Sequence, residues 1–191
     1  MGVNEEVNRK RIQMKVRNLG VGAGILMFAL SLTAAASTSD QSVSPIEKKV
    51  SHELNMLPYS NVFDYMTFSV DQNGKVTLNG KVTNPVLKSD AAKVVKRVEG
   101  VELVENDIQV LPVSFFDDGL RARLYRTIYG YGPLQRYSLG VNKPIRIIVQ
   151  NGHVTLLGVV ASEFDKNVAG MRANSVAGAF SVDNQLRVVK G

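Results

Sequence analysis

The chain repeats one segment of its own sequence. Residues 73–80, Asn-Gly-Lys-Val-Thr-Leu-Asn-Gly, return 78 positions later as Asn-Gly-His-Val-Thr-Leu-Leu-Gly at residues 151–158. The register then continues without a gap, and residues 73–112 and 151–190 are identical at 14 of 40 aligned positions. A repeat of this length predicts two copies of one small fold rather than a single larger domain.

The size of each copy limits its stability. A unit of roughly 65–75 residues buries only about 60% of its unfolded surface, so we expect the two copies to gain stability by packing together. The chain contains no cysteine. This excludes disulfides, thiolate metal sites, cysteine nucleophiles and a lipid-modified N-terminal cysteine.

Hydrophobic periodicity and turn residues predict the same elements in both copies: a helix, two strands, a second helix and a strand. In the first copy these elements fall at residues 44–57, 67–72, 76–82, 85–99 and 104–110. In the second copy they fall at residues 117–130, 145–149, 154–160, 162–178 and 182–188. Asn73-Gly74 and Asn151-Gly152 each predict a two-residue type I′ turn.

The helices also determine the fold class. Each helix has one apolar stripe, so both helices of a copy must cover one face of its three-stranded sheet. We therefore expect an α+β protein of two tandem small α/β sandwiches. The expected divisions are a signal or anchor, a linker, and two domains, at residues 1–36, 37–43, 44–112 and 113–190.

The N-terminal segment has the layout of an export signal. Five basic residues between Arg9 and Arg17 precede an uncharged run from Leu19 to Ala36, where small residues suit cleavage. An uncleaved anchor stays open, because 18 uncharged residues are close to the shortest stretch that spans a bilayer. Both alternatives predict an exported protein, either periplasmic or held on the outer side of the inner membrane.

The repeated pattern resembles the BON domain. In each copy, Asn-Gly and Val-Thr-Leu-x-Gly-x-Val are followed by an amphipathic helix, a glycine and Val-x-Asn-x-hydrophobic-x-Val, at residues 73–110 and 151–188. With the preceding helices, the resemblance covers nearly all of residues 44–190. It implies a non-catalytic protein of the cell envelope, in a family associated with osmotic stress, phospholipid surfaces, secretin pores and envelope integrity.

No set of residues in the sequence indicates catalysis, a cofactor or a metal. Asp117 and Asp118 are the one adjacent acidic pair in the folded part, and they suit the start of a helix, where one of them would cap it. His52 and His153 lie far apart and outside any triad, so we interpret both as surface residues.

Two groups of residues are candidates for contact with lipid or a partner. The basic side of the second helix suits anionic headgroups, although it also suits plain solvation; its residues are Lys88, Lys93, Lys96 and Arg97. Residues 125–144 mix tyrosine with arginine, which suits a membrane surface or a packed domain junction equally. The candidates there are Tyr125, Arg126, Tyr129, Tyr131, Arg136 and Tyr137.

A further candidate is the outer face of the second sheet. Aligned without a gap, five polar positions of the first copy become apolar in the second: Ile145, Ile147, Val149, Leu157 and Val159. Soluble monomers avoid exposing an apolar patch of several hundred Å². We expect a cover, which is either the first copy with residues 111–143, or else a partner protein, a second copy of the chain or lipid.

These patterns favour a binding protein over an enzyme. Of the net charge of +6, half belongs to residues 1–36, so the folded part is only mildly basic and nucleic acid is not expected as a partner. The first hypothesis is an envelope protein that binds anionic phospholipid or an envelope assembly. The alternative is a soluble, chaperone-like stress protein that binds apolar protein segments.

Overall fold

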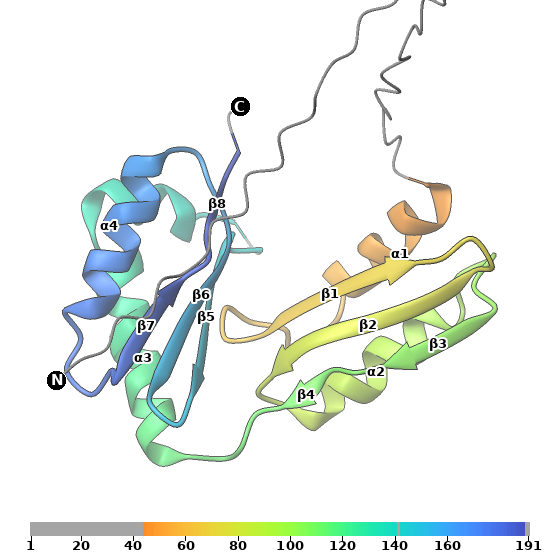
Figure 1. The fold of residues 1–191 in the computed structure, drawn as a ribbon, viewed down its shortest axis with the longest axis horizontal. Coiled ribbons are helices and arrows are strands. Elements are labelled where there is room, and N and C mark those ends of the chain that lie inside the picture. Colours follow the sequence, from red (N-terminus) through yellow and green to blue (C-terminus); the bar gives the residue numbers. More distant parts are fainter. Residues whose placement is uncertain (1–43, 141, 190–191) are drawn as a thin grey trace, which may run out of the picture. The chain divides into compact units, whose positions relative to one another are not determined.

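The computed structural model describes residues 44–140 and 142–189, all within one compact unit, Gln41–Gly191. The expected export signal or anchor and the linker lie outside the described residues. Both repeated segments form a sheet with two helices (Figure 1), which confirms the expected α+β fold.

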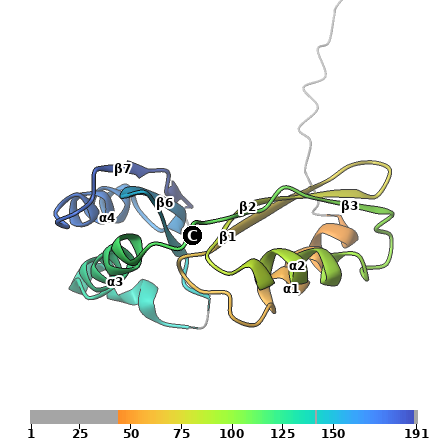
Figure 2. The same ribbon diagram turned by 90° about the horizontal axis from the view of Figure 1, so that it is seen from below.

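The first copy has a mixed sheet with β2 at its centre. Its elements are α1 (Pro45–Asn55), β1 (Tyr65–Val70), β2 (Lys75–Val82), α2 (Pro85–Val95), β3 (Leu103–Asn106) and β4 (Gln109–Val110). β2 pairs antiparallel with β1 and parallel with β3 and β4. Figure 2 shows α1 and α2 on the same side of this sheet, as their single apolar stripes predict.

The second copy repeats this topology and adds a 3₁₀ helix. Its elements are α3 (Phe115–Tyr129), η1 (Gly132–Ser138), β5 (Ile145–Gln150), β6 (His153–Val160), α4 (Glu163–Asn174), β7 (Ser181–Asn184) and β8 (Arg187–Val188). β6 is the central strand, antiparallel to β5 and parallel to β7 and β8.

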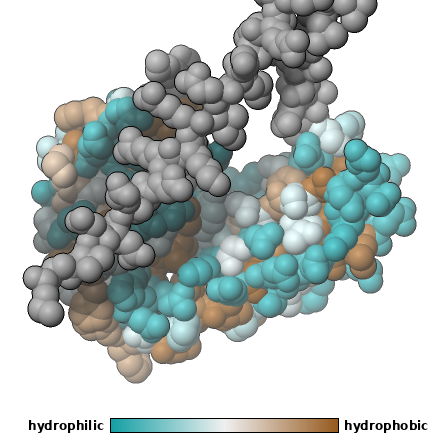
Figure 3. Space-filling view, in the orientation of Figure 1, coloured by the Kyte–Doolittle hydropathy of each residue, from teal (hydrophilic) through white to brown (hydrophobic). Residues whose placement is uncertain are grey.

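The two faces of the first sheet differ as the alternation along β2 predicts. Val76, Leu78 and Val82 are fully buried and pack with Leu87 of α2 in the core. The opposite face carries partly exposed polar residues such as Thr77. Figure 3 shows hydrophilic and intermediate residues beside hydrophobic ones on the surface over β1 and β2.

In each copy, the last expected strand is divided into two short strands by an asparagine side chain. Asn106 donates from its side chain to the carbonyl of Lys88 at 2.7 Å and accepts from the backbone N–H of Ile108 at 3.2 Å. Asn184 makes the matching bond to the carbonyl of Lys166 at 2.7 Å. The repeated asparagine therefore ties the sheet to the helix.

Helix α3 begins earlier than expected. Ser114 caps it by accepting from the backbone N–H of Asp117 at 3.2 Å, so the expected cap at Asp117 or Asp118 is wrong. Asp117 is instead buried, and its carboxylate accepts from the backbone N–H groups of Asn151 and Gly152, both at 2.8 Å. A residue of α3 thus holds the hairpin turn of its own sheet.

The two hairpin turns differ, although both contain Asn-Gly. Asn151 and Gly152 have φ values of 53° and 77°, as the expected type I′ turn requires. In the turn of the first copy, Gly74 has a positive φ of 75° but Asn73 does not, and the carboxylate of Asp71 accepts from the backbone N–H of Asn73. The type I′ prediction is therefore wrong for the first copy.

The expected outer apolar face of the second sheet is also wrong in part. Ile145, Ile147 and Val149 have no exposed surface and belong to the core beneath α3 and α4. Leu157 and Val159 are half-buried and alternate with the core residues of β6.

The difference in loop length explains this error. Val70 pairs with Val76 in the first hairpin, whereas Val149 pairs with Val154 in the second, so the first loop is one residue longer. Because side chains alternate along a strand, one residue reverses every side chain of β5 relative to an ungapped alignment. The apolar residue of β5 on the outer face is Ile148.

Candidate functional site

A pocket of about 510 Å³ opens where the connection between α1 and β1 meets α3 and β5, within the size range of ligand sites. We call it the Phe63–Tyr125 pocket after the two aromatic residues in its wall. Its lining residues are Ser60, Asn61, Val62, Phe63, Ala122, Tyr125, Arg126, Lys143 and Arg146.

The wall formed by residues 60–63 is fixed at both ends. The buried carboxylate of Asp64 accepts from the backbone N–H of Asn61 at 3.0 Å, and the Asn61 side chain accepts from that of Phe63 at 2.8 Å. The carbonyl of Val62 accepts from the backbone N–H of Ile147 in β5 at 2.8 Å, and its side chain enters the core of the second copy. This part of the pocket is therefore formed before any ligand arrives.

The charged residues that line the pocket are all basic. Arg126, Lys143 and Arg146 line it, and no acidic residue is among its lining residues. Arg146 is oriented by donating from its guanidinium to the carbonyl of Asn61 at 2.7 Å. A concave site with one sign of charge concentrates its field and attracts anions.

Two aromatic rings line the pocket, and a third, buried ring packs against one of them. The rings of Phe63 and Tyr125 meet edge to face at 6.4 Å, and Tyr125 lies 5.1 Å from Tyr129. Tyr129 is buried and donates its hydroxyl to the carbonyl of Ile145 at 2.5 Å. Burial raises the pKa of Tyr129 well above its ordinary value, so this hydroxyl stays neutral.

The other tyrosine and arginine candidates lie elsewhere in the second copy. Arg172 lies 4.9 Å over the ring of Tyr131. Arg136 and Tyr137 both donate to the buried carboxylate of Asp165 at the start of α4. Burial alone would raise the pKa of Asp165, but these hydrogen bonds together with one from the Ser162 hydroxyl outweigh it and lower the pKa.

None of the basic residues expected on the second helix lines this pocket. Lys88 and Lys93 belong to α2, where Lys93 pairs with Asp90 at 3.0 Å on the surface. Lys96 and Arg97 follow the end of α2 and are exposed. They form a second cationic surface, none of whose residues lines the pocket.

An exposed apolar group at the start of α3 was not expected from the sequence. Val113 and Phe115 are 91% and 93% exposed, and Phe116 stacks on Phe180 with ring centres 5.8 Å apart. We call the three phenylalanines, Phe115, Phe116 and Phe180, the aromatic cluster. The adjacent pair Phe115-Phe116 was the available signal, since large apolar residues just before a helical stripe have no place in that stripe.

The pocket also contains residues that sequence reasoning did not select as site residues: Phe63, Lys143 and Arg146. Phe63 precedes the first expected strand, and Lys143 lies within residues 125–144 but was not among the candidates there. Arg146 left a weaker signal, as a single cation within an otherwise apolar strand.

Within residues 44–140 and 142–189, no helix has both the length and the apolar character needed to cross a bilayer. Over the same ranges, His, Asp and Glu residues do not gather in threes as a metal ion would require. His52 is exposed, and His153 lies on the surface with its Nδ1 2.7 Å from the Ser181 hydroxyl.

Comparison with known proteins gives one family and a few similar proteins. The family model described as BON domain matches residues 42–112 and 137–190. The outer membrane lipoprotein DolP of Haemophilus influenzae is 31% identical over 119 residues, which are 60% of this chain and 58% of DolP. The chain therefore aligns with little more than half of the length of this curated relative.

Among solved structures, the C-terminal domain of CdsD, a structural protein of the type III secretion system of Chlamydia trachomatis, covers 76% of this chain. The match takes in 98% of that domain, with 14% sequence identity and a TM-score of 0.30. Similarity at this level says nothing about function.

Proposed function

The chain belongs to the BON domain family, and on that premise we propose that it is a non-catalytic cell-envelope protein that binds anionic phospholipid surfaces. The relative DolP is named an outer membrane lipoprotein, which supports a location of this chain in the cell envelope. The absence of cysteine means that a lipid-modified cysteine cannot attach these 191 residues to a membrane. Export through the segment 1–36 remains part of the proposal.

The observation that carries the proposal is the charge of the Phe63–Tyr125 pocket. Three basic residues and no acidic residue are among those that line it. A well-placed Lys or Arg near an anionic membrane surface contributes about 1 kcal/mol to binding. Phe63 and Tyr125 beside these cations suit the interface, where a ligand is polar at one end and apolar at the other.

The orientation of α3 connects this pocket with the aromatic cluster. Phe115, Ala122 and Arg126 are separated by seven and four residues, which places them on one side of an α-helix. All three are exposed. Arg126 can therefore meet a headgroup while Phe115, about three turns away, enters the boundary between headgroups and acyl chains.

The proposal is tested by co-sedimentation with vesicles of phosphatidylglycerol and of phosphatidylcholine. We expect binding to the anionic vesicles that weakens with added salt. The double variant Arg126→Glu/Lys143→Glu should bind at least about tenfold more weakly, because two attractive charges become repulsive.

A matched control is available on the other cationic surface. Lys96→Glu/Arg97→Glu changes the net charge by the same amount at exposed positions outside the pocket. Loss of binding in this variant alone would move the contact to α2 and its end. Equal binding to both kinds of vesicle, or no effect of either variant, would contradict the phospholipid proposal.

The alternative, a chaperone-like protein that binds apolar protein segments, is favoured by the exposure of the aromatic cluster. Phe115→Ser and Phe180→Ser should then reduce suppression of aggregation of an unfolded test protein and leave vesicle binding unchanged. Under the phospholipid proposal, Phe115→Ser should weaken vesicle binding, and no suppression of aggregation is expected.

A further inference from the structure

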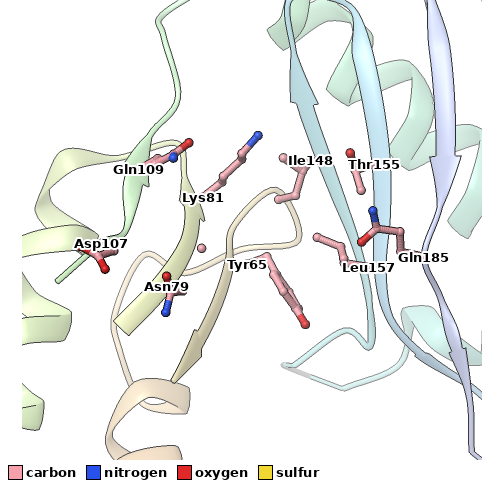
Figure 4. Close-up of a pocket in the computed structure, with 10 residues that line it drawn as sticks. Tyr65, Asn79, Lys81, Asp107, Gln109, Ile148, Thr155, Leu157 and Gln185 are labelled. Carbon is pink, nitrogen blue, oxygen red and sulfur yellow. The ribbon is translucent and has the colours of Figure 1, made fainter. Parts of the chain in front are cut away.

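A second cavity, which we call the inter-sheet cleft, shares no lining residue with the Phe63–Tyr125 pocket. It has a volume of about 410 Å³ and lies between residues of the first sheet and residues of the second (Figure 4). Two of the strands that line it are β2, with Asn79 and Lys81, and β6, with Thr155 and Leu157.

The polar part of the cleft is rich in amides and carries no net charge. Asn79, Gln109 and Gln185 contribute amide groups, which both donate and accept hydrogen bonds. Lys81 and Asp107 balance each other in charge. This composition contrasts with the wholly cationic Phe63–Tyr125 pocket and does not select an anion.

The apolar part of the cleft is formed by Tyr65, Ile148 and Leu157, as Figure 4 shows. Ile148 is only 3% exposed, although it lies on the outer face of its sheet. The cleft therefore offers an aromatic ring and two aliphatic side chains next to its amides.

Divergence between the two copies produces this mixture. Asn79 and Leu157 occupy the same position of the repeat, as do Asp107 and Gln185, and all four line the cleft. At the first of these positions, one sheet therefore contributes a polar group and the other an apolar one.

The backbone of the two central strands is already engaged. β2 is bonded to β1 on one side and to β3 and β4 on the other, and β6 is bonded likewise to β5, β7 and β8. An extended peptide therefore finds no free edge on β2 or β6 to which it could add as a strand. Recognition in the cleft depends on side chains.

We propose that the inter-sheet cleft binds an uncharged glycan that contains N-acetylated hexosamine rings. Asn79, Gln109 and Gln185 match the hydroxyl and acetamide groups of such a ring, since each amide pairs with both donors and acceptors. The ring of Tyr65 suits the C–H face of the sugar, and Ile148 and Leu157 suit the acetyl methyl group. This site goes beyond the phospholipid proposal and does not depend on it.

The test is calorimetric titration of the full chain with tri-N-acetylchitotriose, without lipid. Saturable binding is expected, with weaker binding of cellotriose, which lacks the acetamide groups. Asn79→Leu, which copies the residue of the second copy, and Gln109→Ala should each weaken binding about fivefold to tenfold, the effect of one lost hydrogen bond.

Two controls separate this site from the rest of the molecule. Thr67→Ala changes an exposed residue of β1 that does not line the cleft, and it should leave the titration unchanged. Arg126→Glu/Lys143→Glu should also leave it unchanged, even if vesicle binding is lost. No binding by the wild-type chain, or equal binding by Asn79→Leu, overturns the proposal, as does displacement of the glycan by an extended peptide with higher affinity.

Discussion

Two glycines at equivalent positions of the repeat are required by the chain that faces them. A Cβ atom on Gly80 would lie 2.0 Å from the carbonyl oxygen of Tyr65, and one on Gly158 would lie 1.9 Å from that of Pro144. Their φ values are 136° and 108°, which L side chains rarely adopt. These glycines are shared by both copies because of backbone packing, and no ligand is needed to explain them.

We predict that Gly158→Ala lowers the free energy of unfolding by about 2–4 kcal/mol, since the new methyl group is both strained and overpacked. Urea denaturation followed by circular dichroism measures this loss. Gly132→Ala is the control, because nothing lies within 4 Å of its Cβ position and its φ is not positive. Similar midpoints for the two variants would show that the backbone near Pro144 yields easily.

At the scale of elements, η1 is attached to the start of α4 through one carboxylate. Asp165 accepts from the hydroxyls of Ser162 and Tyr137, at 2.7 and 2.8 Å, and from Arg136. The Tyr137 hydroxyl also accepts from the backbone N–H of Ala161 at 2.8 Å. Residues more than twenty positions apart are thus held together by this small polar network.

The lowered pKa of Asp165 gives this network a predictable dependence on pH. In the unfolded chain the carboxyl has a pKa of about 3.9, so its contribution to stability is complete above that pH. The contribution is lost as the pH falls through the lower folded value. The difference in urea midpoint between wild type and Asp165→Ala should therefore be larger at pH 7 than at pH 2.5, and a constant difference would contradict this account.

The sequence predicts these elements well, because Asn-Gly turns, glycine stops and apolar stripes are local signals. It does not predict the face of β5, because the Asn-Gly alignment gives no information about the length of the loop before Asn73. The sequence also does not predict that Asp117 binds the hairpin turn, because its partners Asn151 and Gly152 are more than thirty residues away. Only tertiary contact distinguishes a turn-binding carboxylate from a helix cap.

The same reason limits prediction of the site. Tyr125 and Arg126 could be selected from the sequence because tyrosine and arginine alternate around them. Phe63 comes from the connection before β1, and its place beside α3 depends on pairing between Val62 and Ile147. No local pattern reports that long-range contact.

At the scale of the whole molecule, the core of the second copy includes a residue that precedes the first sheet. The side chain of Val62 is 8% exposed and belongs to the cluster formed by α3, α4 and the second sheet. Its carbonyl covers one N–H of the β5 edge. Residues 113–190 alone would therefore lack part of their core.

Val62→Ala should destabilise the chain by about 1–3 kcal/mol, through lost burial and the cavity left behind. Val113→Ala removes the same atoms from a side chain that is 91% exposed, so its effect should stay within about 0.5 kcal/mol. Thermal denaturation of both variants provides the comparison. Equal melting temperatures would mean that Val62 does not connect the two copies energetically.

The unequal hairpin loops restrict recombination between the two halves of this gene product. A hybrid that joins β1 to β6 must inherit the longer loop together with β1, because Val70 reaches its partner only across that spacing. Splicing the shorter loop onto β1 would turn Phe68 and Val70 toward water and Thr67 and Ser69 toward the helices. Modules that look interchangeable in an alignment are thus exchangeable only as whole hairpins.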